Sequence, residues 1–231
     1  MLLLSVGACD PLLGQGVGHD PSDSPFRDIN THQTLSFLIG RFGGSLGNAG
    51  VGAQSTTDFG FRFRNRLSGP LELMIGTTII PSKRNVIDPT KPDSAGRQVG
   101  TVDYNMITAD IQLLLSLTGA KTWHTLAPWI AFGFGVETAT RPTTDPGGYK
   151  AGLNFTFVPS IGLDVHLSRK LGLVFEARDN TIRYEYPLAY FAPTDSTGKA
   201  LAPVLDPARF SDKQLTHNFT ISAGFSYHFT F

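Results

Sequence analysis

The sequence predicts an all-β protein, a single eight-stranded antiparallel up-and-down barrel over residues 33–231. Three observations lead to this prediction. Eight segments alternate apolar and polar residues with a period of two, the pattern of a strand whose two faces meet different surroundings. No segment shows the 3.6-residue period of an amphipathic helix. The connections alternate between short and long, as expected when each strand pairs with the next in an antiparallel sheet.

Each segment keeps its large apolar side chains on one face and mostly small or polar residues on the other. The segments cover residues 34–40, 58–64, 71–79, 107–117, 126–137, 153–167, 171–178 and 218–231. Two prolines, Pro128 and Pro159, fall inside the fifth and sixth segments. Because proline cannot donate a ladder hydrogen bond, we expect a bulge or a missing bond at each.

The connections divide into two classes of length. Short turns cover residues 65–70, 118–124 and 168–170, and longer loops cover residues 44–55, 81–100, 140–148 and 187–215. With an even number of strands, this alternation predicts that both ends of the barrel segment lie at the short-turn end. The long loops then gather at the opposite end.

The last segment, residues 218–231, alternates along its full length and ends on aromatic residues. The spacing of Gly224, Tyr227, Phe229 and Phe231 resembles the C-terminal signal strand of bacterial outer-membrane β-barrels. In that family the strand is read by the barrel-assembly machinery. The resemblance therefore implies that this machinery is a partner of the chain.

The alternation of turns and loops resembles the eight-stranded outer-membrane barrels of the OmpA and OmpX type. The resemblance implies a transmembrane barrel in a bacterial outer membrane, surrounded by membrane lipid and lipopolysaccharide. It also implies short periplasmic turns, long extracellular loops and periplasmic termini. Aromatic residues are then expected to ring both interfaces. The expected rings are Trp123, Tyr227, Phe229 and Phe231 at the turn end, and Tyr104, Tyr149, Tyr184 and Tyr186 at the loop end.

The orientation of the two faces separates a membrane barrel from a soluble, lipocalin-like binding barrel, which has the same period. The interior of an eight-stranded barrel is narrow. Small residues on the polar face and bulky ones on the apolar face therefore favour a barrel with its apolar face toward lipid. Under this interpretation Phe155, Phe175 and Phe225 point outward, whereas Arg62 and Glu176 are enclosed.

Charged residues in the middle of segments are then predicted to lie in the lumen. They are Arg62, Arg64, Glu72, Asp110, Asp164, Glu176 and Arg178. Since isolated buried charges are costly, we expect an ion-pair network that closes the lumen. The expected pairs join Arg62 or Arg64 to Glu72, and Asp164 to Arg178.

Composition and the first residues add weaker indications. Nineteen basic and nineteen acidic residues cancel, so charge gives no case for nucleic-acid binding. Residues 1–9 resemble the end of a signal peptide, and Val6 to Cys9 resemble a lipobox in which Cys9 is lipidated. The alternative is a free-standing apolar N-terminus. Residues 10–32 are predicted to form an irregular lead-in.

The function predicted from these features is a structural or interaction scaffold, with no cofactor and no catalytic residues. Loop 187–215 is the expected site of contact with a protein partner, because loops on rigid scaffolds often carry function. A narrow channel for small or apolar solutes is one alternative. Another is a lipid-modifying enzyme, since His166 and Ser168 form a His-x-Ser sequence. The six histidines show no metal-ligand spacing.

Overall fold

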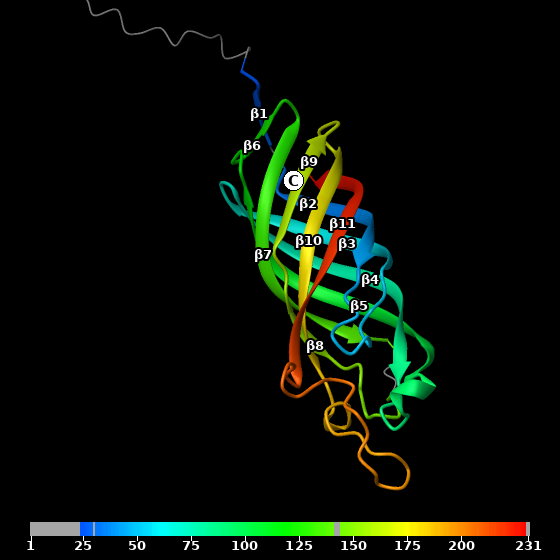
Figure 1. Ribbon diagram of the computed structural model, residues 1–231. Coiled ribbons are helices and arrows are strands. Elements are labelled where there is room, and N and C mark those ends of the chain that lie inside the picture. Colours follow the sequence, from blue (N-terminus) through cyan, green and yellow to red (C-terminus); the bar gives the residue numbers. More distant parts are fainter. Residues whose placement is uncertain (1–23, 30, 141–143, 230–231) are drawn as a thin grey trace, which may run out of the picture.

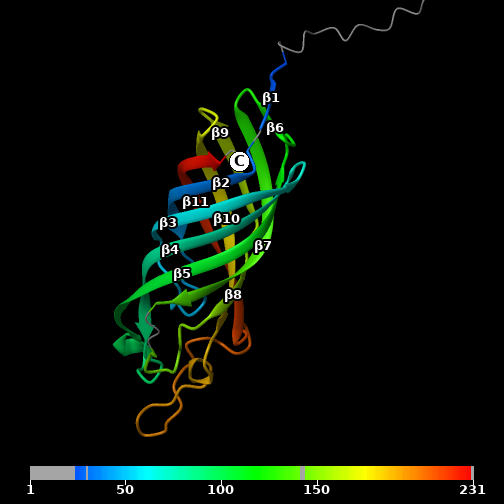
Figure 2. The same cartoon turned by 180° about the vertical axis from the view of Figure 1, so that it is seen from behind.

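The chain forms a closed antiparallel β-barrel, seen from opposite sides in Figures 1 and 2. The computed structural model describes residues 24–29, 31–140 and 144–229. The wall consists of β2 (Gln33–Gly43), β3 (Thr56–Ser68), β4 (Leu71–Ile87), β5 (Gln98–Ser116), β7 (Leu126–Ala139), β8 (Asn154–Phe157) with β9 (Ser160–His166), β10 (Leu171–Glu185) and β11 (Lys213–Phe229). Because β8 and β9 both lie between β7 and β10, the wall has the predicted eight positions.

Closure of the barrel depends on one long-range seam. The last strand, β11, pairs with the first wall strand, β2, from Phe219 opposite Gly43 to Phe229 opposite Gln33. On its other side β11 pairs with β10 from Leu171 opposite Tyr227 to Glu185 opposite Lys213. The C-terminal segment is therefore paired on both edges, and the ring leaves no open edge there.

The two prolines differ in effect. Pro159 separates β8 from β9, but the register on β7 is the same on both sides, with Phe134 opposite Phe157 and Ala131 opposite Ser160. Its carbonyl still accepts the Asp179 amide at 3.0 Å, so only the bond that a proline cannot donate is missing. Pro128 lies within β7 with no shift of register, so of the two expected effects only the missing bond applies there.

The strands extend further at the loop end than predicted. β4 runs to Ile87 and β5 begins at Gln98, so half of the predicted loop 81–100 is strand. Polar residues occur on both faces of this extension, which hides the apolar alternation from the sequence. At the opposite end, β1 (Phe26–Asp28) pairs with β6 (Lys121–Trp123), so part of the predicted irregular lead-in is also strand.

Short helical turns occur only at the loop end of the described residues, η2 (Asp93–Ala95) and η3 (Leu188–Tyr190). No helix within the described part of the chain is both long and apolar enough to cross a membrane. The connection between β10 and β11 covers residues 186–212 and extends beyond the loop end of the barrel (Figure 1). Its η3 residue Tyr190 and Leu205 are buried there, in an apolar cluster shared with other loops and with the end of β10.

Candidate functional site

The outer wall carries an apolar band. Phe155 and Phe225 are 79% and 71% exposed, and Phe175 also faces outward, whereas Arg62 and Glu176 are only 2% and 3% exposed. This orientation is the one predicted from side-chain bulk. Along the outward face of the wall, charged residues such as Arg41, Lys83, Asp103, Arg183 and Glu185 occur toward the loop end. The band therefore has a charged border on that side.

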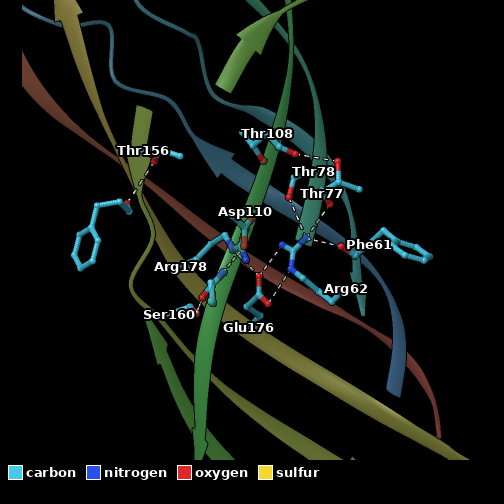
Figure 3. A network of polar contacts seen from close by, with 12 residues as sticks. Phe61, Arg62, Thr77, Thr78, Thr108, Asp110, Thr156, Ser160, Glu176 and Arg178 are labelled. Carbon is cyan, nitrogen blue, oxygen red and sulfur yellow. Dashed lines mark hydrogen bonds and ion pairs between the residues drawn. The ribbon is translucent and has the colours of Figure 1, made fainter. Parts of the chain in front are cut away.

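The centre of the lumen holds a buried ion-pair network (Figure 3). Glu176 accepts from Arg62 through both carboxylate oxygens, at 2.8 and 3.2 Å. The same carboxylate lies 2.7 Å from Nε of Arg178, whose Nη1 donates to Asp110 at 3.0 Å. Two arginines and two carboxylates thus neutralise one another, as a low-dielectric interior requires.

The network is tied to the wall by polar neighbours. Arg62 also donates to the carbonyls of Phe61 and Thr77, at 3.0 and 2.8 Å. Gln112 donates to Asp110 at 2.5 Å and accepts from Ser160 at 2.7 Å. Because these partners come from several strands, the network crosses the lumen from wall to wall.

A second charged cluster lies toward the turn end. Arg64 donates to Asp164 at 2.7 Å and lies 3.9 Å from Glu72, and Arg66 lies 3.4 Å from the same Glu72. The expected pairing of Arg64 with Glu72 is therefore present, although it is long. Arg66 was not predicted as a member. Its Nη1 also donates to the carbonyl of Ile29 at 2.7 Å, which ties the lead-in across this end.

The expected pair of Asp164 with Arg178 is wrong. On neighbouring strands Asp164 lies opposite Val174, and Arg178 lies opposite Ser160. Each residue finds its partner across the lumen instead, on β3 and on β5. Alternation predicts which face a residue occupies, but the partner depends on the relative shift of all strands around the ring.

Beyond the central network, toward the loop end, the lumen is closed by a third group of side chains, which we call the aromatic cap. Arg84 binds Asp145 through two bonds of 2.6 and 2.7 Å, and its guanidinium lies 5.3 Å from the centre of the Tyr149 ring. The rings of Tyr149, Tyr186 and Tyr190 stack on one another with centres 6.3–6.4 Å apart. Side chains from several loops thus pack into one cluster that covers the lumen.

The prediction that tyrosines ring the loop-end interface is wrong. Tyr104, Tyr149, Tyr184 and Tyr186 are all buried. The position of Tyr104 could have revealed this, because it shares its parity along β5 with the inward Asp110. Burial raises the pKa of the loop residues Tyr149 and Tyr190 above its usual range, so both hydroxyls stay neutral.

The C-terminal motif lies in β11. Gly224 pairs with Leu38 of β2, and Tyr227 makes an edge-to-face contact with Phe229 at 5.0 Å between ring centres. Tyr227 is partly exposed on the outer wall near the turn end, where its ring was expected. Phe231 and Cys9, the residue of the expected lipobox, lie outside the described residues.

The side chains of His166 and Ser168, the two residues of the His-x-Ser sequence, contact different partners and not each other. Ser168 Oγ accepts from the amides of Lys170 and Leu171, at 3.3 and 3.0 Å, and so stabilises the turn. The ring of His166 stacks on His228 with centres 4.7 Å apart. Within the described residues, no group of histidine, cysteine or acidic side chains could hold a metal ion.

Fold and site together define an eight-stranded antiparallel barrel with an apolar outer wall and a charged, filled interior. No protein-family model and no curated protein matches the chain. In fold, the chain is similar to eight-stranded outer-membrane β-barrel proteins of known structure. Neisserial surface protein A is 14% identical, with 89% of this chain and 98% of that chain covered and a TM-score of 0.46.

Two further structures have the same type of fold. The attachment invasion locus protein Ail of Yersinia pestis is 8% identical, with 87% of this chain and 99% of that chain covered and a TM-score of 0.39. A major outer membrane protein of Thermus thermophilus is 12% identical, with 85% and 99% covered and a TM-score of 0.39. These likenesses concern the fold alone.

Proposed function

We propose that this protein spans a bacterial outer membrane as a closed barrel and serves as a rigid scaffold for loops at the cell surface. The short turns then face the periplasm. The apolar band on the outer wall supports membrane insertion, because a water-soluble barrel would leave Phe155 and Phe225 in water at a large hydrophobic cost. Enclosed arginines and carboxylates on the inner face support the same placement.

The filled lumen is the observation that favours a scaffold over a channel. The Arg64 cluster, the central network and the aromatic cap occupy three successive levels. A cavity of about 780 Å³ opens at the turn end, but the cavity that reaches Arg64 measures only about 20 Å³. That volume holds about one water molecule and is too small for a solute path.

Membrane insertion is tested by cell fractionation combined with a heat-modifiability gel. We expect the full chain in the outer-membrane fraction, and faster migration of unboiled than of boiled samples, because a folded membrane barrel resists detergent until heated. Partition of the chain into the aqueous phase without detergent would contradict the proposal and favour a soluble binding barrel.

Planar-bilayer recordings test whether the lumen is closed. We expect no steady conductance from the parent protein, because salt-bridged side chains cross the lumen. The Arg178→Ala variant should also stay closed, since the Arg64 cluster and the aromatic cap remain. Discrete, solute-dependent conductance of the parent would favour the narrow channel instead.

We further propose that the connection between β10 and β11, residues 186–212, contacts a protein partner. Its base is rigid, because Tyr190 and Leu205 are packed in the cap, and the Val204 and Leu205 amides donate to the Tyr190 carbonyl at 2.8 and 3.0 Å. Its tip is exposed and polar around Asp195 and Lys199. An exposed tip on a fixed base suits recognition, because little loop entropy is lost on binding.

The rigidity of the cap predicts the effect of Asp145→Ala. Loss of this carboxylate leaves the buried Arg84 guanidinium without its bidentate partner and loosens residues 144–153. In limited trypsin digestion we expect cleavage after the exposed Lys150 to become about tenfold faster. Asp206→Ala serves as the control, since Asp206 lies on the exposed part of the long loop and its ion pair with Arg209 is exposed. Equal digestion of Asp145→Ala and the parent would show that the cap does not hold the loop.

A further inference from the structure

The barrel wall has a notch at the loop end, between β8 and β10. β10 pairs with β8 only at Thr181 and Ile182, whereas its pairing with β11 continues to Glu185. Arg183–Glu185 therefore have no strand partner on the β8 side among the described residues. A groove of about 440 Å³ lies at this position and reaches inward to Tyr149 and Tyr184.

The lining of the groove combines apolar and charged side chains. Leu153 and Phe155 are exposed and continue the apolar band. Lys150, Arg183 and Glu185 line the same groove. Arg183 forms one ion pair, 2.9 Å to the exposed Glu185, and Lys150 forms no ion pair within the described residues. With two cations and one carboxylate in its lining, the groove keeps a net positive charge beside an apolar surface.

We propose that this notch binds a phosphorylated lipid of the outer leaflet. An acyl chain covers Leu153 and Phe155, while the phosphate accepts hydrogen bonds from Lys150 and Arg183. The position fits this ligand because the apolar band gives way to charged residues here, at the depth where lipid head groups begin. This inference rests on the proposed membrane placement.

A lipid titration of the full chain in detergent, read by native mass spectrometry, tests the inference. The probes are phosphatidic acid and a diacylglycerol with the same acyl chains, which differ only in the phosphate. We expect the parent to bind phosphatidic acid more tightly. The double variant Lys150→Gln with Arg183→Gln should bind phosphatidic acid about five- to tenfold more weakly, with diacylglycerol binding unchanged.

The matched control is the double variant Arg41→Gln with Lys83→Gln, which removes two exposed basic residues on β2 and β4 outside the groove. It should bind both lipids like the parent. An equal loss in both double variants, no loss in either, or displacement of the lipid by inorganic phosphate would overturn the inference. Failure of the parent to insert into vesicles contradicts the proposed function. If the parent inserts but the Lys150→Gln with Arg183→Gln variant binds phosphatidic acid as the parent does, only the lipid site at the notch is contradicted.

Discussion

Replacement of Glu176 by alanine should lower the free energy of unfolding by about 3–5 kcal/mol. The reason is that the carboxylate is shared by Arg62 and Arg178, at 2.8 and 2.7 Å. Without it, two buried guanidinium groups lose their shared carboxylate, and the remaining ion pair to Asp110 involves Arg178 alone. The measurement is reversible urea unfolding in micelles, followed by gel mobility and by tryptophan fluorescence.

Glu185→Ala provides a matched control. Glu185 lies on the same strand, and its ion pair with Arg183 is 2.9 Å long but is solvent-exposed. We expect this substitution to lower the free energy of unfolding by about 1 kcal/mol or less. Adding Arg62→Met to Glu176→Ala should recover part of the stability, because it removes one of the uncompensated charges. Similar losses from Glu176→Ala and Glu185→Ala would show that the network does not stabilise the lumen.

Gly224→Ala should weaken closure of the barrel. We expect the free energy of unfolding to fall by about 1–3 kcal/mol and the folding yield to be lower. A Cβ at this position would collide with the carbonyl oxygen of Phe37 and would lie 2.8 Å from the Cα of Leu38. Both atoms belong to the backbone of β2, so no flexible side chain can move aside. The clash falls on the seam where the last strand meets the first.

Gly100→Ala is the control for this substitution. Gly100 also lies in a strand, β5, but a Cβ there would meet no atom within 4 Å. Because alanine also reduces the entropy of the unfolded chain, we expect the free energy of unfolding to stay the same or to rise by up to about 1 kcal/mol. Both variants are compared by the fraction that becomes heat-modifiable after refolding. A Gly224→Ala protein that refolds as completely as Gly100→Ala would contradict the close approach of β11 to β2.

Period-two alternation was sufficient for the strands of the apolar band. The segments around Phe59, Ile111 and Phe225 all form wall strands with these residues outward. The same signal was lost beyond Pro81, where β4 continues with Ser82, Lys83 and Arg84. There the outer face is charged as well, so the two faces no longer differ in polarity. For this reason a loop was predicted from the sequence at this position.

In the lumen, the sequence predicted the face that each charged residue occupies, but most contacts between these residues depend on the tertiary structure. The sequence placed Arg62, Arg64, Asp110, Asp164, Glu176 and Arg178 on the inner face, and each of them is buried. Apart from the long contact of Arg64 with Glu72, it did not identify their partners. It also missed Arg84 and Asp145, because Asp145 lies in a loop with no periodicity. It also assigned Tyr149 and Tyr186 to a membrane interface, whereas the folded loops stack them over the lumen.

The sequence by itself determined that the strands alternate, that their number closes a barrel and that the apolar side faces outward. These properties follow from the residue-by-residue pattern, since successive side chains of a strand point to opposite faces. Only the tertiary structure decided which charges meet, how the loops cover the lumen and where β8 leaves the wall open. Those features depend on strand tilt, register and loop packing, which bring together residues far apart along the chain.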